Sequence, residues 1–285
     1  ILVLNETKVL PARLELRKPT GGKILVLCLE KSDGLVKILA NRDLKLGETL
    51  SLRKNIAFLV AKFEKNNYYL KPLFKIEKFD EVLNSYGTAP IPPYIKPPLH
   101  KRKRLRSDYQ SIFAKHDGSI AAPTASLHFT SRLLRKLKKQ GVRIVFVTLH
   151  VGLGTFSPLR EENLASGMLH SERYVISKGS AQELMSAKRL KRPIIAAGTT
   201  VARTLESAAR KGRIQPGENA TRLFIRPPYR FKFVDGLITN FHVPRSSLLF
   251  LVSALAGRRA IRKAYRHAIR KRYRLFSFGD AMLIR

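Results

Sequence analysis

Two histidines in this sequence stand beside small, flexible residues. His128 ends a segment that contains Thr124, and His150 opens a segment that contains Gly152, Gly154, Thr155 and Phe156. An imidazole exchanges protons near neutral pH, and glycines let the backbone approach a ligand closely. Taken singly, each histidine is better explained as part of an ordinary loop.

Three more polar segments have residue types suited to the same chemistry. His170 and Glu172 are two positions apart, so an extended segment places both on one wall, where they can move a proton. Gly198-Thr199-Thr200 opens a predicted helix with Arg203 one turn on, and can hold a carboxylate or a phosphate. By itself this motif is more simply a helix cap. Asn240 and His242 follow a predicted strand. Together these loops predict one shared cleft.

The elements that position these segments follow from the hydrophobic pattern. Thr130 or Ser131 can cap a helix that ends at Gly141, and Val142–Leu149 is an apolar run typical of a strand buried on both faces. Helices and strands alternate from about Ile76 onward, with strands expected at 168–176, 193–197, 223–226 and 234–239. This alternation predicts a layered α/β/α domain, whose sites lie at the carboxyl ends of its strands.

The N-terminal part has a different pattern. Short β-like runs separated by turn residues fill the sequence between Gly21 and Pro72, and none of them is typical of a long helix. We therefore expect a small β-barrel domain over residues 13–75, inserted into an α/β domain made of 1–12 and 76–285.

The charge is the unusual part of the composition. Lys and Arg number 55 against 20 Asp and Glu, which gives a net charge of +35. Such an excess indicates a polyanionic partner, nucleic acid first and an anionic membrane surface second. The strongest cationic segments are the run His100–Arg106, with Arg102, Lys103 and Arg104, and the predicted helix Arg258–Tyr273.

The predicted helix has two faces. Its apolar residues are expected to pack on the domain, and they are Ala260, Ile261, Ala264, Tyr265, Ala268 and Ile269. Arg262, Arg266 and Arg270 recur on the other face, where RNA phosphates would offset their mutual repulsion. A solvated helix face is the simpler alternative.

Several classes of protein are excluded by what the sequence lacks. Cys28 is the only cysteine, so there is no disulfide and no thiolate metal cluster. The sequence contains no P-loop, no glycine-rich dinucleotide motif and no His-Glu-x-x-His. No apolar run is long enough to span a membrane and no signal peptide is visible, so we expect a cytoplasmic protein. Because Ile1 is not a start methionine, we expect preceding residues.

A set of motifs resembles the S-adenosylmethionine:tRNA ribosyltransferase-isomerase family. They cover nearly the whole chain in the family's order: Asn5-Glu-Thr-Lys-Val-Leu-Pro-Ala-Arg-Leu, Ala121-Ala-Pro-Thr-Ala-Ser-Leu-His-Phe-Thr, Val147-Thr-Leu-His-Val-Gly-Leu-Gly-Thr-Phe, Met168-Leu-His-Ser-Glu, Gly198-Thr-Thr, Tyr229-Arg-Phe-Lys, Leu237-Ile-Thr-Asn-Phe-His-Val-Pro-Arg-Ser-Ser-Leu-Leu and Tyr273-Arg-Leu-Phe-Ser-Phe-Gly-Asp-Ala-Met-Leu-Ile. Departures from the family pattern are Glu6, where an Asp is usual, the insertion-like Leu169, and the lack of an N-terminal segment before Asn5.

The resemblance implies a fold and a reaction. The family fold is an α/β domain with an inserted β-barrel. The family moves the ribosyl part of S-adenosylmethionine onto 7-aminomethyl-7-deazaguanine in the tRNA anticodon wobble position, forms epoxyqueuosine, and releases adenine and methionine. It implies S-adenosylmethionine as co-substrate, tRNA as partner, no metal and no membrane, and we expect a monomer.

On this interpretation the candidate residues take three roles. Proton transfer falls to His150, His170 and Glu172. Substrate binding falls to Thr124, His128, Gly152, Gly154, Thr155, Phe156, Gly198, Thr199, Thr200, Arg203, Tyr229, Arg230, Asn240 and His242. Binding of the tRNA backbone falls to Arg102, Lys103, Arg104, Arg262, Arg266 and Arg270. The alternatives are a basic RNA-binding protein without catalysis, which leaves the Thr/Gly/His loops unexplained, and a methyltransferase, which would release S-adenosylhomocysteine.

Overall fold

The chain folds into two compact units. The structure is a computed structural model that describes residues 1–92, 95, 105–152 and 159–285. The first unit consists of Ile1–Lys8 and Gln110–Arg285, and the second of Val9–Tyr109. The predicted barrel segment 13–75 lies inside the second unit, while the domain bounds drawn from the sequence stay a prediction.

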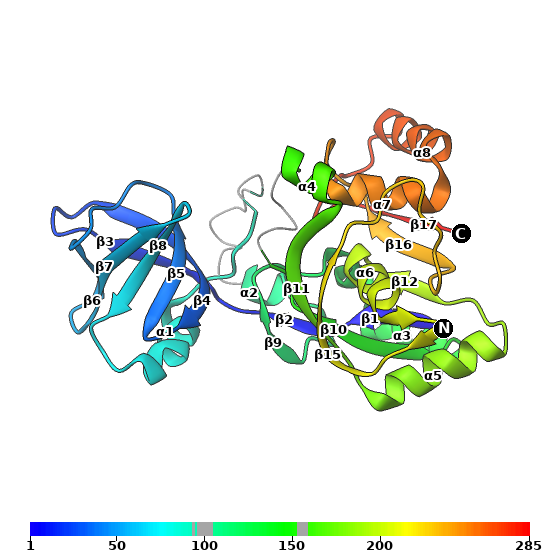
Figure 1. The fold of residues 1–285 in the computed structure, drawn as a ribbon, viewed down its shortest axis with the longest axis horizontal. Helices are drawn as coiled ribbons and strands as arrows, with labels where there is room; N and C mark the ends of the chain where they lie inside the picture. The colour runs from blue at the N-terminus through cyan, green and yellow to red at the C-terminus, as the bar shows by residue number, and fades with distance from the viewer. Residues whose placement is uncertain (93–94, 96–104, 153–158) are drawn as a thin grey trace. The chain divides into compact units, whose positions relative to one another are not determined.

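A mixed sheet forms the centre of the first unit, with the strand order β15-β11-β10-β1-β12-β16-β17 (Figure 1). Strands β10, β1, β12 and β16 are parallel to one another, and β11 and β17 pair antiparallel at either side of them, with β15 beyond β11. The strands are β1 (Leu2–Asn5), β10 (Ile144–Leu149), β11 (Met168–Ile176), β12 (Ile195–Ala197), β15 (Gly217–Leu223), β16 (Gly236–Asn240) and β17 (Ala281–Ile284).

The helices and short elements of this unit surround the sheet. Small two-stranded sheets pair β2 with β9 and β13 with β14. The helices are η3 (Thr124–His128), α3 (Ser131–Lys139), α4 (Glu161–Ser166), α5 (Lys178–Arg189), α6 (Thr199–Ala208), α7 (Ser247–Ala256) and α8 (Arg258–Arg270), and the short strands are β2 (Thr7–Val9), β9 (His116–Ser119), β13 (Ala209–Arg210) and β14 (Arg213–Ile214).

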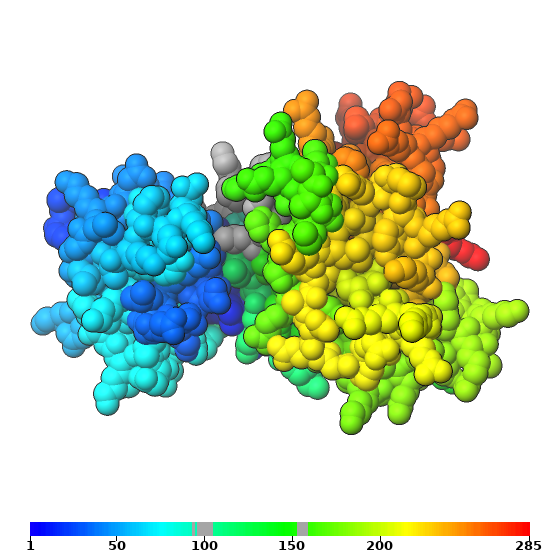
Figure 2. All heavy atoms as spheres, viewed as in Figure 1, coloured from blue at the N-terminus to red at the C-terminus, as the bar shows by residue number. Residues whose placement is uncertain are grey.

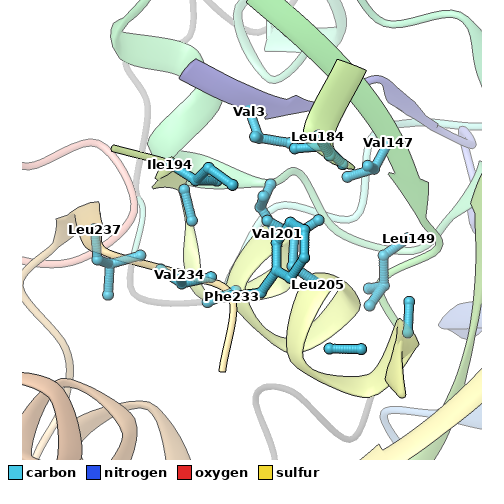
Figure 3. Packing of buried hydrophobic residues seen from close by; sticks show 14 of the residues in the cluster. Val3, Val147, Leu149, Leu184, Ile194, Val201, Leu205, Phe233, Val234 and Leu237 are labelled. Carbon is cyan, nitrogen blue, oxygen red and sulfur yellow. The ribbon is translucent and has the colours of Figure 1, made fainter. Parts of the chain in front are cut away.

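The sheet is covered on both faces because its strands are apolar on both. Successive side chains of a strand point to opposite faces, so Val3 and the pair Leu2 and Leu4 belong to different cores. Val3 lies in the core that α5, α6 and α7 cover, part of which is shown in Figure 3. The other core includes Phe129 and side chains of α3. The predicted α/β/α layering is confirmed.

The capping predictions are confirmed where the structure tests them. Thr130 is the N-cap of α3, and its hydroxyl accepts a hydrogen bond from the amide of Leu133 at 3.1 Å. The helix expected from Ile76 begins as a 3-10 turn, η1 (Ile76–Lys78), and continues as α1 (Phe79–Tyr86).

Two strand predictions need correction. The strand expected at 223–226 lies earlier, at Gly217–Leu223, and β17 was not expected at all. Both lie at the edges of the sheet, and residues 217–220 are exposed, so this strand lacks the apolar alternation on which the prediction depended.

The second unit contains a closed barrel with the strand order β3-β4-β5-β8-β7-β6. Its interior is built from alternating residues such as Leu14 and Leu16, and α1 covers it through Phe79 and Leu83. The barrel predicted from the sequence is confirmed. Its elements, with the helix α2, are β3 (Arg13–Arg17), β4 (Lys23–Ser32), β5 (Leu35–Ala40), β6 (Thr49–Arg53), β7 (Ile56–Glu64), β8 (Asn67–Pro72) and α2 (Leu105–Asp108).

A buried carboxylate on α6 fixes the chain that leads into β16. Glu206 is 2% exposed and accepts hydrogen bonds from the Tyr229 hydroxyl at 3.1 Å and from the amides of Lys232, Phe233 and Val234 at 2.9, 2.9 and 3.0 Å. Burial, followed by the charge of Glu206, raises the pKa of Tyr229. The carboxylate therefore replaces solvent for a whole turn of backbone.

We expect Glu206→Gln to lower the free energy of unfolding by about 3 kcal/mol, because an amide nitrogen would then face buried N–H donors. Urea denaturation measures this. Glu183→Gln is the matched control: Glu183 is half exposed and lies 3.5 Å from Arg143, so its loss should change stability by less than about 1 kcal/mol. Equal effects of the two substitutions would contradict a structural role for Glu206.

Candidate functional site

The carboxyl ends of β1, β10, β12 and β16 meet at one edge of the sheet, because these strands are parallel neighbours. The residues at or just beyond these ends are Asn5, His150, Gly198 and Asn240. Helix η3, which contains Thr124 and His128, also contacts β16. Several of the predicted strand-end segments are thus brought to the same edge.

Asn5 ties three of these ends together. Its side chain is fully buried, donates to the carbonyl of Leu149 at 3.0 Å and accepts from the amide of Leu149 at 3.1 Å. The same amide group donates to the Thr200 hydroxyl at 3.3 Å, and its oxygen accepts from the amide of Thr7 at 3.1 Å. Asn5 and Thr7 were not among the predicted site residues. The signal that could have found them is a polar pair directly after an apolar strand.

His150 is held by a chain of hydroxyls. Its Nδ1 lies 2.9 Å from the Thr7 hydroxyl, which lies 2.7 Å from the Ser119 hydroxyl, and Ser119 accepts from the amide of Val151 at 2.8 Å. A Cβ at Gly118 would come within 2.6 Å of Nδ1, and Gly118 has φ +147, so glycine is required there. Burial, and then Arg173, lowers the pKa of His150, which favours the neutral, basic imidazole.

His128 and Asn240 contact each other across the edge. The side-chain amide of Asn240 donates to the carbonyl of Phe276 at 3.0 Å and lies 3.1 Å from Nε2 of His128. An NH₂ group facing Nε2 requires that nitrogen to be the acceptor, so His128 is neutral with its proton on Nδ1. Burial lowers the pKa of His128, which favours the neutral ring.

Gly198, Thr199 and Thr200 connect β12 to α6 at this edge. Gly198 has φ +100, and a Cβ there would lie 3.4 Å from that of Ala125 in η3. Thr199 and Thr200 are both 7% exposed, and the Thr200 hydroxyl is used by Asn5. The motif therefore connects the strand ends of this edge.

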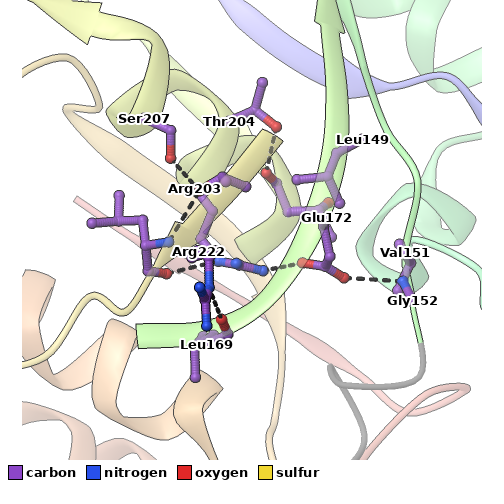
Figure 4. A network of polar contacts seen from close by, with 12 residues as sticks. Leu149, Val151, Gly152, Leu169, Glu172, Arg203, Thr204, Ser207 and Arg222 are labelled. Atoms are coloured by element: carbon purple, nitrogen blue, oxygen red, sulfur yellow. Dashed lines mark hydrogen bonds and ion pairs between the residues drawn. The ribbon is translucent and has the colours of Figure 1, made fainter. Parts of the chain in front are cut away.

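Glu172 and Arg203 form a buried ion pair (Figure 4). One oxygen of Glu172 accepts from Nη1 of Arg203, and the other accepts from the amide of Gly152 at 3.0 Å. Arg203 also donates through Nε to the carbonyl of Leu223 at 3.1 Å. His170 is exposed and lines a small pocket together with Glu172 and Arg203. Glu172 itself is 5% exposed.

The other predicted residues of this unit are more dispersed. Nε2 of His242 lies 2.9 Å from the Thr239 hydroxyl, and the backbone amide of His242 donates to the Tyr265 hydroxyl at 2.7 Å. Tyr229 is bonded to Glu206, and Arg230 is exposed. The pocket that His170 lines does not include His150, Thr199 or His242, and the single shared cleft stays a prediction.

Comparisons with known proteins agree along the whole chain. Residues 1–284 match the family described as "Queuosine biosynthesis protein". The chain belongs to this family. The S-adenosylmethionine:tRNA ribosyltransferase-isomerase of Carboxydothermus hydrogenoformans is 45% identical over 289 residues, which cover 100% of this chain and 84% of that protein. The protein of the same name from Vesicomyosocius okutanii is 42% identical over 287 residues, with 100% and 83% covered.

A solved structure supports the fold of this queuosine biosynthesis protein. The crystal structure of S-adenosylmethionine tRNA ribosyltransferase from Thermotoga maritima matches with a TM-score of 0.50 at 35% identity, over 100% of this chain and 82% of that chain. Its relatives have the name of an enzyme, so the predictions of family and of enzyme class are confirmed.

The cations of α8 form an exposed basic surface on this protein. Arg262, Arg266 and Arg270 are exposed and line a surface hollow with the other cations of the helix, which is orange-red in Figure 2. Ile261 and Ala268 are buried as predicted, whereas Ile269 is 63% exposed and Ala260 is exposed too, so the apolar face is narrower than predicted. Arg270 is the last residue of the helix, which ends three residues earlier than the sequence suggested.

Six of the predicted site residues belong to segments that the structure does not describe. Gly154, Thr155, Phe156, Arg102, Lys103 and Arg104 lie outside the described residues. Among the residues that are described, there is no group of three or more His, Cys, Asp or Glu side chains that could hold a metal ion. In the same residues no helix has the length and apolarity needed to cross a membrane. The metal-free reaction, the cytoplasmic location and the monomeric state stay predictions.

The buried histidines make stability depend on pH. Burial lowers the pKa of His242 to about 4, against about 6.5 in an unfolded chain. Between these values the unfolded chain binds a proton that the folded chain does not, so stability falls as the pH drops through this window. At pH 4 the unfavourable burial of neutral His242 should lower the free energy of unfolding by about 3 kcal/mol relative to its value above pH 6.5.

We expect His242→Gln to flatten the dependence of the unfolding free energy on pH between 6.5 and 4, measured by urea denaturation at a series of pH values. His128 and His150 also have lowered pKa values and should leave a residual slope. His116→Gln, which changes an exposed histidine, serves as the control. An unchanged slope in His242→Gln would show that His242 is protonated without cost.

Proposed function

We propose that this protein transfers the ribosyl part of S-adenosylmethionine to 7-aminomethyl-7-deazaguanine in the wobble position of a tRNA anticodon. Epoxyqueuosine is formed, and adenine and methionine are released. The observation that carries the proposal is the match of the entire chain to relatives named S-adenosylmethionine:tRNA ribosyltransferase-isomerase. The basic surface of α8 supports the part played by tRNA.

The reaction begins with the loss of a proton near the sulfonium, which acidifies the adjacent carbon. The ribose then opens and adenine leaves, the amine of the base attacks, and methionine leaves with breakage of the carbon–sulfur bond as the epoxide closes. We assign the proton acceptor to His150, because its Nδ1 is fixed by Thr7 and burial keeps its ring neutral. This role requires the tautomer in which Nδ1 carries the proton and donates to the Thr7 hydroxyl, which leaves Nε2 as the basic nitrogen.

Glu172 receives a different role in this proposal. Both of its oxygens already accept hydrogen bonds, from Arg203 and from the amide of Gly152. These contacts favour a positioning carboxylate, which holds the segment after His150, over a carboxylate that takes a proton in each turnover. His170 remains a second candidate for proton transfer.

Incubation with S-adenosylmethionine and precursor-bearing tRNA tests the function directly. We expect free adenine and a tRNA that carries the epoxide. S-adenosylhomocysteine as the product would instead indicate a methyltransferase, and tRNA binding without turnover would indicate a non-catalytic RNA-binding protein.

His150→Gln should lower the rate of adenine release by about 10²–10⁴-fold, because the base is lost, while the affinity for S-adenosylmethionine largely remains. Rates come from single-turnover assays and affinities from calorimetry. Glu183→Gln, which changes a half-exposed carboxylate of α5 paired with Arg143, is the control and should leave both unchanged. Full turnover in His150→Gln would exclude this histidine as the base.

The tRNA contact of α8 is tested by replacing Arg262, Arg266 and Arg270 with Gln. Loss of three phosphate contacts should weaken tRNA binding. The affinity should also fall less steeply with salt, so that the slope of log affinity against log salt becomes less negative by roughly 2–3. Replacement of Arg132, Arg135 and Lys139 on α3 is the matched control, since these exposed cations carry the same charge on another helix. If the salt dependence of tRNA binding falls more in the α3 variant than in the α8 variant, the contact lies on α3. Binding of S-adenosylmethionine should be unchanged in both.

A further inference from the structure

The segment of residues 273–280, which follows α8, takes no part in the reaction described above, although it is attached to the edge of the sheet. Its first residue, Tyr273, donates through its amide to the carbonyl of Ala268 at 2.9 Å. The Tyr273 ring packs edge-on against Phe241, with 6.1 Å between the ring centroids. Phe241 is buried and directly follows Asn240, the last residue of β16. Tyr273 therefore lies against the strand end that carries Asn240.

A closed turn follows Tyr273. The amide of Asp280 donates to the Arg274 carbonyl at 2.7 Å, and the amide of Arg274 donates to the Asp280 carboxylate at 2.8 Å. Phe276 lies in the left-handed region with φ 69, which is strained for a bulky residue. Asn240 holds this conformation by donating to the Phe276 carbonyl at 3.0 Å. Strain of this kind persists only where the surroundings fix the backbone, so the turn presents its side chains in a defined arrangement.

Exposed apolar side chains gather on this turn and at the end of α8. Tyr273 is 43% exposed, and Phe278 in the turn is 39% exposed. Ile269, in the last turn of α8, is more exposed than either. Large apolar groups that are exposed together indicate a surface for a partner.

The same surface is cationic. Arg270, Lys271 and Arg272 lead directly into Tyr273, and all three are exposed. His267 connects them to the hollow of cations on α8, because it lines that hollow and its ring packs edge-on against Tyr273 at 6.1 Å. Aromatic rings interleaved with cations are typical of surfaces that bind single-stranded nucleic acid, where bases stack on the rings and cations contact the phosphates.

The combination of rings and cations favours an unpaired RNA segment over two other polyanions. A duplex offers only its phosphates to such a surface, because its bases are stacked on each other inside the helix. An unpaired segment offers its phosphates and the faces of its bases. An anionic membrane would also attract the cations, but interfacial helices use an apolar stripe along their length, and here the exposed apolar groups lie at one end of the helix.

We propose that Tyr273 and Phe278 bind unpaired nucleobases of an RNA by stacking, while the cations at the end of α8 contact the neighbouring phosphates. The inference rests on the proposed function for the place of these bases, which are the neighbours of the wobble base. Asn240 bonds the turn to the edge of the sheet, so bases stacked there lie beside the base that reacts. The two rings thereby select a single-stranded loop over a duplex.

Two RNA molecules test this surface: a hairpin with an unpaired loop, and a blunt duplex with the same number of phosphates. Neither carries the precursor base, and S-adenosylmethionine is omitted, so binding is measured apart from catalysis. At one salt concentration the wild-type protein should bind the hairpin about 5–50-fold more tightly than the duplex, the effect of base stacking on aromatic side chains. Fluorescence anisotropy of end-labelled RNA measures both affinities.

Tyr273→Leu removes the ring and keeps an apolar side chain against Phe241. It should lower the hairpin affinity to about that of the duplex, with an unchanged salt slope because no phosphate contact is lost. Tyr273→Phe keeps the ring and should retain the preference, and Phe278→Leu should lower it independently. The duplex affinity should stay unchanged in every variant, which reports that the variant is folded. Tyr86→Leu is the matched control, because Tyr86 is a similarly exposed tyrosine beside Arg53 in the barrel unit.

Equal binding of hairpin and duplex by the wild type would overturn the inference, and so would full hairpin preference in either leucine variant. Binding to phosphatidylserine vesicles that depends on Tyr273, without a preference for the hairpin, would assign the surface to a membrane instead. Adenine release from precursor-bearing tRNA separates the two levels. Adenine release without hairpin preference refutes the stacking surface alone, and hairpin preference without adenine release refutes the proposed function alone.

Discussion

The buried amide of Asn5 is the contact on which the arrangement of this edge depends. Parallel strands bring their carboxyl ends together, and the backbone groups beyond those ends lose their partners in the sheet. Asn5 satisfies both the amide and the carbonyl of Leu149 and reaches Thr200 as well. One side chain thereby fixes where β10 ends, where α6 begins, and the direction in which the chain leaves β1.

The position of His150 follows from this contact. Thr7 follows Asn5 by two residues, and its amide donates a hydrogen bond to the Asn5 side chain. This contact places the Thr7 hydroxyl beside Nδ1 of the His150 imidazole. On the other side of the same loop, Gly152 donates to Glu172, which is paired with Arg203 on α6. The histidine segment is therefore anchored at both ends by buried polar groups, which satisfy each other only in this arrangement.

Charge is distributed very unevenly between interior and surface. Two of the 20 acidic residues, Glu172 and Glu206, are buried and fully used by internal donors. The cations of α8 are exposed, and the ion pairs at the surface are mostly open to solvent, where each contributes little. The excess positive charge therefore stabilises the fold little and remains available to attract a polyanion.

Local sequence determined the elements and their ends. Features that depend on residues close in sequence could be predicted from the hydrophobic pattern. They are the Thr130 cap, the apolar strands, the barrel and the cationic face of α8. The family motifs placed the polar segments at strand ends as well. Only the tertiary structure decided which of these segments meet. Asn5 and Leu149 are 144 residues apart, and Glu172 and Arg203 are 31 apart. Their contacts depend on strand order and register, which the hydrophobic pattern does not encode. The exposed edge strand β15 and the exposed Ile269 were not predicted, because the burial of a residue is set by the elements that pack against it.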